Sequence, residues 1–202
     1  MNTIEQFNEH VMPTYGRFDV VMEHGKNHNA IDENGKSYID FGSGIGTNSL
    51  GYCNDKWVEA VCNQVKSLQH HSNYYYSKVQ ADFAEKLAEM TGYSKMFFGN
   101  SGAEANECAI KLARKYSFDK YGKGRHNIIT LVNSFHGRTL CTLSATGQES
   151  FHNYFFPFVE GFVNIELSVG CVSYPYDHEL TSGFFYGLEV DIILPGRDVY
   201  SK

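Results

Sequence analysis

A glycine-containing turn, Gly-Asn-Ser-Gly at residues 99–102, stands between an apolar run that ends at Phe98 and a segment with helical spacing. The first N–H groups of a helix lack intrahelical acceptors and lie at the positive end of its dipole, so they can hold a phosphate. Ser101, Gly102 and Ala103 are therefore candidate phosphate-binding residues. The alternative is a structural turn in which Ser101 caps the helix and Glu104 complements the dipole.

A second motif, Ser-Phe-His-Gly-Arg-Thr at residues 134–139, follows a β-branched run. Phe135 offers an aromatic face, and the planar guanidinium of Arg138 can pair with a carboxylate through two hydrogen bonds. Phe135 could equally be a core residue, and Arg138 could pair with an acidic neighbour. Together with the phosphate-binding turn, the motif points to a phosphorylated aromatic cofactor and an amino or keto acid.

The elements around these motifs indicate an α/β layered domain with a largely parallel sheet. Apolar spacing predicts helices from Asn54 or Asp55 to about Leu68, over 79–92, and after the 99–102 turn. Short strands are predicted at 95–98 and 128–132, a short helix at 139–144, and a further strand at 188–194. Ligands of such sheets bind at the C-terminal ends of strands, where both motifs stand. The predicted apolar face of the third helix consists of Ala105, Cys108, Ala109, Leu112, Ala113 and Tyr116.

The first part of the chain is predicted to be a β-rich segment. Strand-like runs at 20–23 and 38–41 flank a turn sequence at 32–35, Asp-Glu-Asn-Gly. Four glycines then predict a loop that can bend freely and approach another backbone closely: Gly42, Gly44, Gly46 and Gly51.

Composition narrows the function classes. The 202 residues are 42% hydrophobic, enough for one sizeable core, and a scattered net charge of -6 disfavours a duplex nucleic-acid binder. No apolar run is long enough to span a bilayer and the first residues do not resemble a secretory signal, so no membrane partner is expected. Five cysteines without a Cys-x-x-Cys pair predict reduced thiols in the cytoplasm. His70 and His71 lack further ligands at metal spacing, so no metal site is predicted.

Several motifs together resemble the class III pyridoxal-phosphate aminotransferases, with a continuous resemblance from about Met12 to Val163. They are Pro-Thr-Tyr-Gly-Arg at 13–17, Tyr-Ile-Asp-Phe-Gly-Ser-Gly-Ile at 38–45, Asn-Ser-Leu-Gly at 48–51, Ser-Asn-Tyr-Tyr-Tyr at 72–76, Gly-Asn-Ser-Gly-Ala-Glu-Ala-Asn-Glu at 99–107, and residues 134–139. Within the family, the chain is most similar to enzymes that transfer the amino group of N-acetylornithine to 2-oxoglutarate in arginine biosynthesis. Donors left open are ornithine, succinylornithine, succinyldiaminopimelate and 4-aminobutyrate.

The resemblance implies roles for individual residues. Gly102 and Ala103, beside Ser101, match the turn whose N–H groups hold the phosphate of pyridoxal 5'-phosphate. Phe135 matches the aromatic residue that stacks on the pyridine ring, and Arg138 matches the arginine that binds the substrate's α-carboxylate.

The remaining implied roles concern the substrate entrance and the assembly. Tyr15, with Ser43 and Gly44, matches a segment that lines the substrate entrance. The fold expected is the α/β fold type I of pyridoxal-phosphate-dependent transferases, incomplete here. Its segments would be an N-terminal β-rich segment (1–52), the first half of the cofactor-binding large domain (53–163) and a divergent tail (164–202). The complete enzyme is expected to be a homodimer that takes an amino acid and 2-oxoglutarate.

Two departures from the family pattern matter. Gly-Tyr-Cys-Asn-Asp at 51–55 replaces the common Gly-His-x-His-Pro. Transamination also needs a lysine that holds the cofactor and moves a proton, and an acid that keeps the pyridine nitrogen protonated. After Arg138 the only lysine is Lys202, and no acid stands in the family's Asp-Glu-Val-Gln context. This chain is therefore expected to be inactive alone, either as a truncated enzyme or as a non-catalytic fragment that pairs with an intact subunit. Resemblance is expected to end near Ser168, which suggests that residues 169–202 either follow a frameshift or are a divergent replacement.

Overall fold

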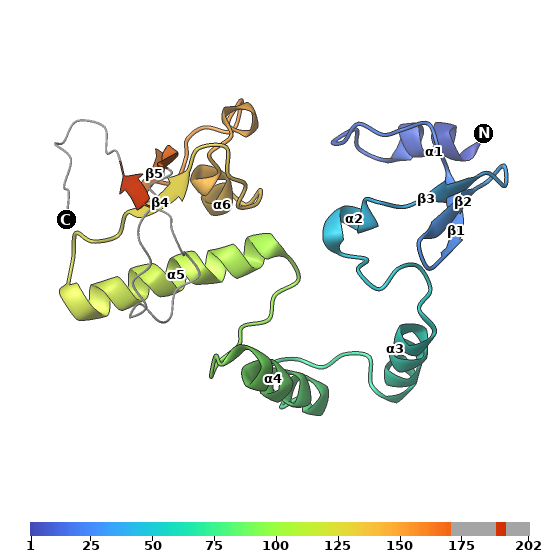
Figure 1. Cartoon of the computed structure of the whole chain (residues 1–202), viewed down its shortest axis with the longest axis horizontal. Helices are drawn as coiled ribbons and strands as arrows, with labels where there is room; N and C mark the ends of the chain where they lie inside the picture. The colour runs from blue at the N-terminus through green and yellow to red at the C-terminus, as the bar shows by residue number, and fades with distance from the viewer. Residues whose placement is uncertain (171–188, 193–202) are drawn as a thin grey trace. The chain divides into compact units, whose positions relative to one another are not determined.

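A computed structural model describes residues 1–170 and 189–192 (Figure 1). The chain forms two compact units, Met1–Lys78 and Val79–Lys202. The boundary between the two units follows Lys78. The segment boundary expected after residue 52 concerns the family's complete enzyme and stays a prediction. Most of the sequence at 169–202, and with it the frameshift hypothesis, lies outside the described residues.

The first unit begins with a helix, α1 (Thr3–His10), which the expectation of a β-rich segment did not include. The Asn2 side chain accepts a hydrogen bond from the Glu5 backbone N–H, and the Glu5 carboxylate accepts one from the Asn2 N–H, both at 2.9 Å. This reciprocal capping box satisfies two N–H groups at the helix terminus. The spacing of Asn2 and Glu5 was the sequence signal for the helix.

Three short strands follow: β1 (Met22–Lys26), β2 (Asn29–Asp32) and β3 (Ser37–Ile39). They form an antiparallel sheet in the order β1-β2-β3, so the predicted two-strand hairpin is wrong in omitting β2. The predicted turn at 32–35 is confirmed between β2 and β3. One carboxylate oxygen of Asp32 accepts from the N–H groups of Asn34 and Lys36, and the other accepts from the Tyr38 hydroxyl, each at 2.9 Å.

The glycine-rich loop contains a single helical turn, α2 (Ser43–Gly46), with left-handed backbone at Gly44. The predicted close backbone approach is found at Gly51, whose φ is 76° and where a Cβ atom would lie 2.6 Å from the carbonyl oxygen of Asn27. Asn27 and the neighbouring Tyr52 exchange backbone hydrogen bonds of 2.9 and 2.6 Å. Glycine is therefore required at position 51 on both grounds.

The helix predicted from Asn54 is confirmed as α3 (Asp55–Ser67), and the Asn54 side chain caps it by accepting from the Trp57 N–H at 3.2 Å. Asp55 occupies the position where the family pattern has proline. Its carboxylate pairs with Lys26 at 2.5 Å, and the Lys26 ammonium also donates to the Cys53 carbonyl at 2.8 Å. The departure from the family pattern at 51–55 thus ties the start of α3 to β1.

The helix predicted over 79–92 is confirmed as α4 (Lys78–Thr91), all but the first residue of which belongs to the second unit. Gly92 follows it with a φ of 77°, the left-handed conformation common after a helix. The strand predicted at 95–98 is wrong in this structure, because those residues have no strand assignment. A buried strand needs neighbours on its edges, and no described strand pairs with this run. Phe98 instead packs against Phe83 of α4, with ring centroids 5.6 Å apart.

The long helix α5 (Gly102–Tyr121) leads to β4 (Ile128–Leu131), which pairs in parallel with β5 (Phe162–Ile165). Between these strands come α6 (Leu140–Ala145) and a 3-10 turn (Glu149–Phe151). The predicted strand at 128–132 and helix at 139–144 are therefore confirmed. The described part of the predicted 188–194 strand is β7 (Glu189–Ile192), which pairs antiparallel with β6 (Leu167–Gly170). Figure 1 shows α5 running beside β4, β5 and α6.

The core of the second unit lies around α6, where residues 142–145 are all buried. The predicted apolar face of α5 is wrong for this structure, because Ala105, Ala109 and Leu112 are exposed and the buried residue of the helix is Ile110. The contacts of α5 with the rest of the unit come from a mixed polar face that includes Asn106 and Glu107. Tertiary contacts therefore select a different side of α5 from its apolar stripe.

Three properties bear on function class, each for the described residues. No helix combines the length and the apolar character needed to cross a bilayer. No group of three or more His, Cys, Asp or Glu side chains is arranged to hold a metal ion. Four cysteines lie in the part of the chain that the structure describes, and all four have free thiols.

Candidate active site

The N-terminus of α5 is the first component of the site. The Ser101 hydroxyl accepts from the Glu104 N–H at 3.2 Å, which confirms Ser101 as the helix cap. The Glu104 carboxylate accepts from the Asn100 N–H, so one donor of the turn is already engaged. The N–H groups of Gly102 and Ala103 belong to the first turn, where helix geometry provides no acceptor. A Cβ atom on Gly102 would meet nothing within 4 Å, so this end of the helix opens onto free space.

The loop that carries Phe135 and Arg138 lies directly against this helix terminus. A Cβ atom on Gly137 would come within 2.7 Å of both the Ala103 Cβ and the Thr142 hydroxyl oxygen. Gly137 also has a φ of 127°, a conformation that side chains with a Cβ rarely adopt. Glycine at 137 and a small residue at 103 therefore allow the two motifs to touch.

Two hydrogen bonds join the loop and α5 beside this contact. The Asn106 side-chain amide donates to the His136 carbonyl at 2.8 Å, and the Thr139 hydroxyl donates to the Glu107 carboxylate at 2.5 Å. Asn106 and Glu107 lie one turn after Ala103, on the side of α5 that faces the loop. Three successive points of the loop are thus fixed to one helix face.

Buried hydroxyl groups support the loop from the other side. Thr146 is fully buried; its hydroxyl oxygen accepts from the His136 N–H at 3.0 Å, and the same hydroxyl donates to the Thr142 carbonyl at 3.0 Å. Thr139 caps α6 by accepting from the Thr142 N–H at 3.2 Å. The backbone N–H and carbonyl of His136 are therefore both held by side chains.

The aromatic and cationic side chains of the loop gather at its exposed side. The rings of Phe135 and Phe151 have centroids 5.5 Å apart, and the Arg138 guanidinium carbon lies 5.7 Å from the Phe135 centroid and 6.0 Å from that of Phe151. Phe135 is 50% exposed, so half of its surface remains accessible. The alternative that Phe135 is a buried core residue is therefore wrong.

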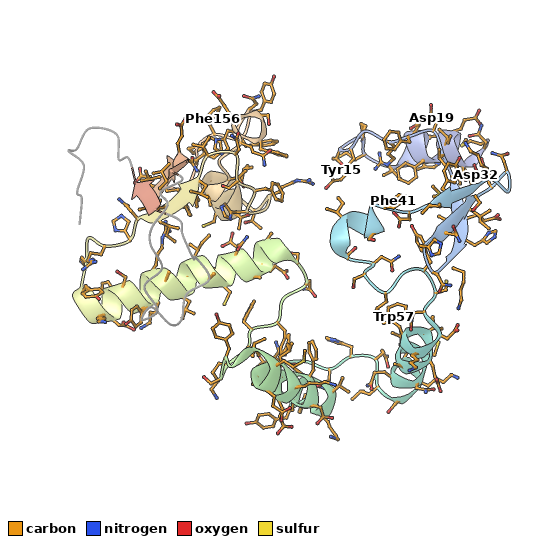
Figure 2. All side chains as sticks on the ribbon, in the orientation of Figure 1. Tyr15, Asp19, Asp32, Phe41, Trp57 and Phe156 are labelled. Carbon is orange, nitrogen blue, oxygen red and sulfur yellow. The ribbon has the colours of Figure 1, made fainter. Side chains whose placement is uncertain are left out.

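The remaining predicted site residues belong to the first unit. Tyr15 lies in the loop after α1 in the first unit, where its side chain is exposed (Figure 2). Ser43 and Gly44 are in α2 of the same unit. Their roles at the substrate entrance stay predictions.

Shifted pKa values mark two carboxyl groups of the first unit and one thiol of the second. Hydrogen bonds, chiefly from the Lys36 N–H, lower the pKa of Asp32 below its usual value. A hydrogen bond from the Tyr52 hydroxyl, with the Gly42 and Ser43 N–H groups, lowers that of Asp40. Burial, with the nearby Glu107 carboxylate, raises the pKa of Cys141.

The residues that join the two motifs were missed in the sequence. Asn106, Glu107, Thr142 and Thr146 hold or support the loop. For Asn106 and Glu107 the available signal was their spacing of three and four residues from Ala103, which places them on one helix face. The two threonines are in or just after a short helix, and spacing alone did not distinguish them from surface residues.

Comparison with known proteins decides the family, because the sequence profile described as Aminotransferase class-III matches residues 11–180. The chain belongs to this family. The match continues beyond Ser168, where the resemblance was expected to end. The family is pyridoxal-phosphate-dependent, and the expected family and α/β fold are confirmed.

Acetylornithine aminotransferases are among the curated relatives of the chain. Those of Haemophilus ducreyi and Wolinella succinogenes are each 52% identical to this class III chain, over 156 and 157 residues, or 77% of it. The chain spans 40% of the length of each of these relatives.

Solved structures agree on the fold. The ornithine aminotransferase of Toxoplasma gondii ME49 matches with a TM-score of 0.77 at 30% identity, over 81% of this chain and 39% of that one. The omega transaminase of Pseudomonas jessenii, in complex with PMP, matches with a TM-score of 0.75 at 27% identity, over 82% of this chain and 39% of that one. Another structure of the Toxoplasma protein is described with partial occupancy of PLP at its active site.

Proposed function

We propose that the chain provides the phosphate-binding and carboxylate-binding part of an acetylornithine aminotransferase. That enzyme would transfer the amino group of N-acetylornithine to 2-oxoglutarate. The observation that carries the proposal is the attachment of the Phe135–Arg138 loop to the N-terminus of α5 through Gly137 and Ala103. Identity of 52% to acetylornithine aminotransferases favours this donor over the other amines.

The arrangement fits pyridoxal 5'-phosphate. The open space at Gly102 leaves room for a phosphate beside the N–H groups of Gly102 and Ala103, which the helix itself does not use. The half-exposed Phe135 ring would stack on the aromatic ring of the cofactor. When bound, this cofactor would act as an electron sink for the carbon atom that carries the transferred amino group.

Arg138 would bind and orient the substrate carboxylate. Its guanidinium lies beside the two phenylalanine rings, and a planar fork of N–H donors suits a carboxylate better than a lysine ammonium does. The rings would also exclude water from one side of the pair and so strengthen it. Tyr15 would contribute to the substrate entrance.

The lysine that holds the cofactor and moves the proton is not assigned to this chain. Between Arg138 and Lys202 the sequence has no lysine, and residues 193–202 lie outside the described residues. The proposal therefore requires further family sequence to complete the site. A homodimeric enzyme and a cytoplasmic location are parts of the same proposal.

A chimera tests the function without requiring activity from this chain alone. Residues 12–163 would replace the matched region of the Haemophilus ducreyi enzyme, which keeps that enzyme's own remaining sequence. We expect purified chimera to transaminate N-acetylornithine with 2-oxoglutarate at a rate within about tenfold of the parent, since a tenfold change corresponds to about 1.4 kcal/mol of barrier. A well-folded, cofactor-loaded chimera without this activity would contradict the proposal.

Ornithine is the second candidate donor, because the Toxoplasma ornithine aminotransferase is the structural match with a TM-score of 0.77. The same chimera distinguishes the donors when it is assayed with ornithine, succinylornithine, succinyldiaminopimelate and 4-aminobutyrate. A higher kcat/KM for one of these than for N-acetylornithine, absent in the parent, would assign that donor to residues 12–163. A folded chimera that binds no cofactor would instead favour the non-catalytic fragment.

A further inference from the structure

Positive charge is concentrated in the second half of α5 and in the α5–β4 loop, which we define as residues 122–127. Residues 111–126 contain six of the 17 lysines and arginines of the chain and one of its 23 acidic residues. This segment therefore has a net charge of +5, although the whole chain has a net charge of -6. Its local field attracts anions even though the chain as a whole is acidic. The six cationic residues are Lys111, Arg114, Lys115, Lys120, Lys123 and Arg125.

The charge of this segment exceeds what its own elements use. The single acid, Asp119, pairs with Lys115. The C-terminal end of a helix carries about half a negative charge, and Lys120 in the last turn of α5 complements it. Lys123 and Arg125 follow the helix, and neither forms an ion pair with a described residue. The charges of these two residues are therefore available to an anion from solution.

Hydrogen bonds hold the α5–β4 loop, which joins the end of α5 to β4 (Figure 1), in a fixed position. The Ser117 hydroxyl donates to the Arg125 carbonyl at 2.6 Å, and Nε of Arg114 donates to the His126 carbonyl at 3.2 Å. Nη2 of the same guanidinium donates to the Glu160 carbonyl at 3.0 Å, just before β5. The loop is thus tied both to α5 and to the segment that leads into β5.

The loop also offers backbone donors. Gly122 and Gly124, on either side of Lys123, have φ values of 78° and 100°, which glycine adopts without strain. Within the described residues, no acceptor is bonded to the N–H groups of Lys123 and Gly124. Successive N–H groups can bind an anion together, and a neighbouring ammonium group strengthens the binding. The loop therefore combines two backbone donors with the Lys123 side chain.

An aromatic ring holds further charge beside the loop. The guanidinium carbon of Arg125 lies 4.2 Å from the centroid of Tyr121, a stacking contact that fixes its position. The Lys120 ammonium lies 5.3 Å from the same centroid. Both charges raise the positive potential around Lys123 without themselves having to touch an anion.

The loop borders a cavity of about 280 Å³. Arg114 and Phe118 of α5 line it together with the loop from Gly122 to His126, and these described lining residues include no carboxylate. A cavity lined by one sign of charge concentrates ions of the opposite sign. Pockets for drug-sized ligands usually have volumes of about 300–1,000 Å³, so this cavity suits a smaller anion.

From the unpaired charge, the fixed loop and the cavity we infer that the α5–β4 loop binds a compact phosphate anion. The Lys123 ammonium and the N–H groups of Lys123 and Gly124 would donate to its oxygen atoms, while Arg125 adds charge from its place on Tyr121. Pyrophosphate and a phosphate monoester present the same oxygen atoms to these donors, so the test includes both. The inference does not depend on the transamination proposed above.

Calorimetric titration of the 202-residue chain with pyrophosphate, and separately with glycerol 3-phosphate, tests the site. We expect one anion to bind per chain, with a Kd below about 1 mM at low salt. Raising the ionic strength from about 0.01 M to about 1 M shortens the screening length from about 30 Å to about 3 Å and should weaken binding at least about tenfold. The ligand that binds more tightly identifies the source of the phosphate.

Substitutions locate the anion. Lys123→Gln removes one charge and one donor and should raise the Kd at least about fivefold, whereas Lys123→Arg should restore most of the affinity. Lys86→Gln is the matched control, because Lys86 is an exposed lysine of α4 in the same unit. It should change the Kd by less than about twofold. In amide NMR spectra, the signals of Lys123 and Gly124 should shift during the titration and that of Lys86 should not.

Three results would overturn the inference. One is the absence of saturable binding, or an equal effect of Lys123→Gln and Lys86→Gln. Another is a shift of the Gly102 and Ala103 amides without a shift at Lys123 and Gly124, which would place the anion at the start of α5. The third is a single strand of about ten nucleotides that binds at least about tenfold more tightly than pyrophosphate through Lys123, which would assign the loop to nucleic acid.

The chimera gives a second measurement if the 202-residue chain does not stay folded in isolation. Its residues 12–163 include the whole α5–β4 loop. Loading the chimera with pyridoxal phosphate and removing the excess blocks the cofactor's own phosphate site before the titration. Lys123→Gln should again weaken pyrophosphate binding more than Lys86→Gln does. Equal affinities of the two variants in a folded chimera would contradict the inference, whatever the transaminase activity of that chimera.

Discussion

The side-chain amide of Asn106 donates a 2.8 Å hydrogen bond to the backbone carbonyl of His136. The bond joins α5, which follows the proposed phosphate-binding turn, to the loop that carries Arg138. Because Gly137 contacts Ala103 on the same helix face, the separation of the two motifs is set by packing and hydrogen bonding. A site that needs a phosphate and a carboxylate held at a fixed separation gains from such a rigid connection.

Gly137→Ala tests the contact between the motifs. A methyl group at 137 would overlap Ala103 and Thr142 at 2.7 Å and would also require a φ of 127°. We expect the free energy of unfolding to fall by about 2 kcal/mol or more, measured by urea unfolding followed by circular dichroism. Gly124→Ala is the matched control, because Gly124 has a φ of 100° with no atom within 4 Å of an added Cβ. Equal losses for the two variants would show that backbone conformation alone matters.

Thr146→Val tests the buried hydroxyl that supports the loop. The change removes the acceptor of the His136 N–H, which is 3.0 Å from the Thr146 oxygen, and should lower stability by about 1–3 kcal/mol. Thr146→Ser keeps the hydroxyl and should restore most of that loss. The His136 amide should exchange with solvent faster in the valine variant and at close to the wild-type rate in the serine variant. Unchanged exchange in Thr146→Val would contradict the assigned bond.

Arg138→Lys, made in the chimera, tests the carboxylate role. The charge is kept and the bidentate fork is lost, so KM for N-acetylornithine should rise by about tenfold, the equivalent of about 1.4 kcal/mol. The dissociation constant of pyridoxal phosphate, measured by equilibrium titration, should change much less. Arg125→Lys is the control, since Arg125 stacks on Tyr121 at 4.2 Å and is absent from the loop. Equal losses of substrate and cofactor affinity would refute the role of Arg138.

Asp32 gives a pH prediction for the first unit. Its folded pKa is below the usual value, chiefly because the Lys36 N–H donates to the carboxylate, with further bonds from Tyr38 and Asn34. A lowered folded pKa means that the ionised form stabilises the fold. The contribution is complete above the unfolded pKa of about 3.9 and is lost as the pH falls through the lower folded value.

The measurement compares Asp32→Asn with the wild type in thermal unfolding at several pH values below 6. The difference in stability should be largest near pH 6 and should disappear in strong acid. Glu33→Gln, an exposed change in the same turn, should show a smaller dependence on pH. A constant difference across the range would mean that the ionised carboxylate is not what stabilises the turn.

Local signals in the sequence were sufficient for much of the fold. Asn54 predicted the start of α3, helical spacing predicted α4, and Ser101 caps α5 as the structural alternative for the 99–102 turn predicted. Each of these depends on a few neighbouring residues, whose backbone hydrogen bonds are decided within one turn. The turn at Asp32 was predictable for the same reason.

The features that failed depend on distant chain segments. The run 95–98 has a strand's composition, but a strand forms only where another edge pairs with it. The apolar stripe of α5 does not form its contact face, because Asn106 and Glu107 find partners on the loop while Leu112 finds no cover among the described residues. Of the candidate site, the turn and the loop were predictable, whereas their attachment through Gly137 was not.

The exposed apolar side chains of α5, among them Leu112, also affect how much of this protein a cell can accumulate. Uncovered apolar surface and unpaired strand edges make a chain prone to aggregation and subject to chaperones and proteases. The exposed side chains of α5 should therefore limit how much of this chain a cell accumulates, and a cell with less chaperone capacity should degrade more of it.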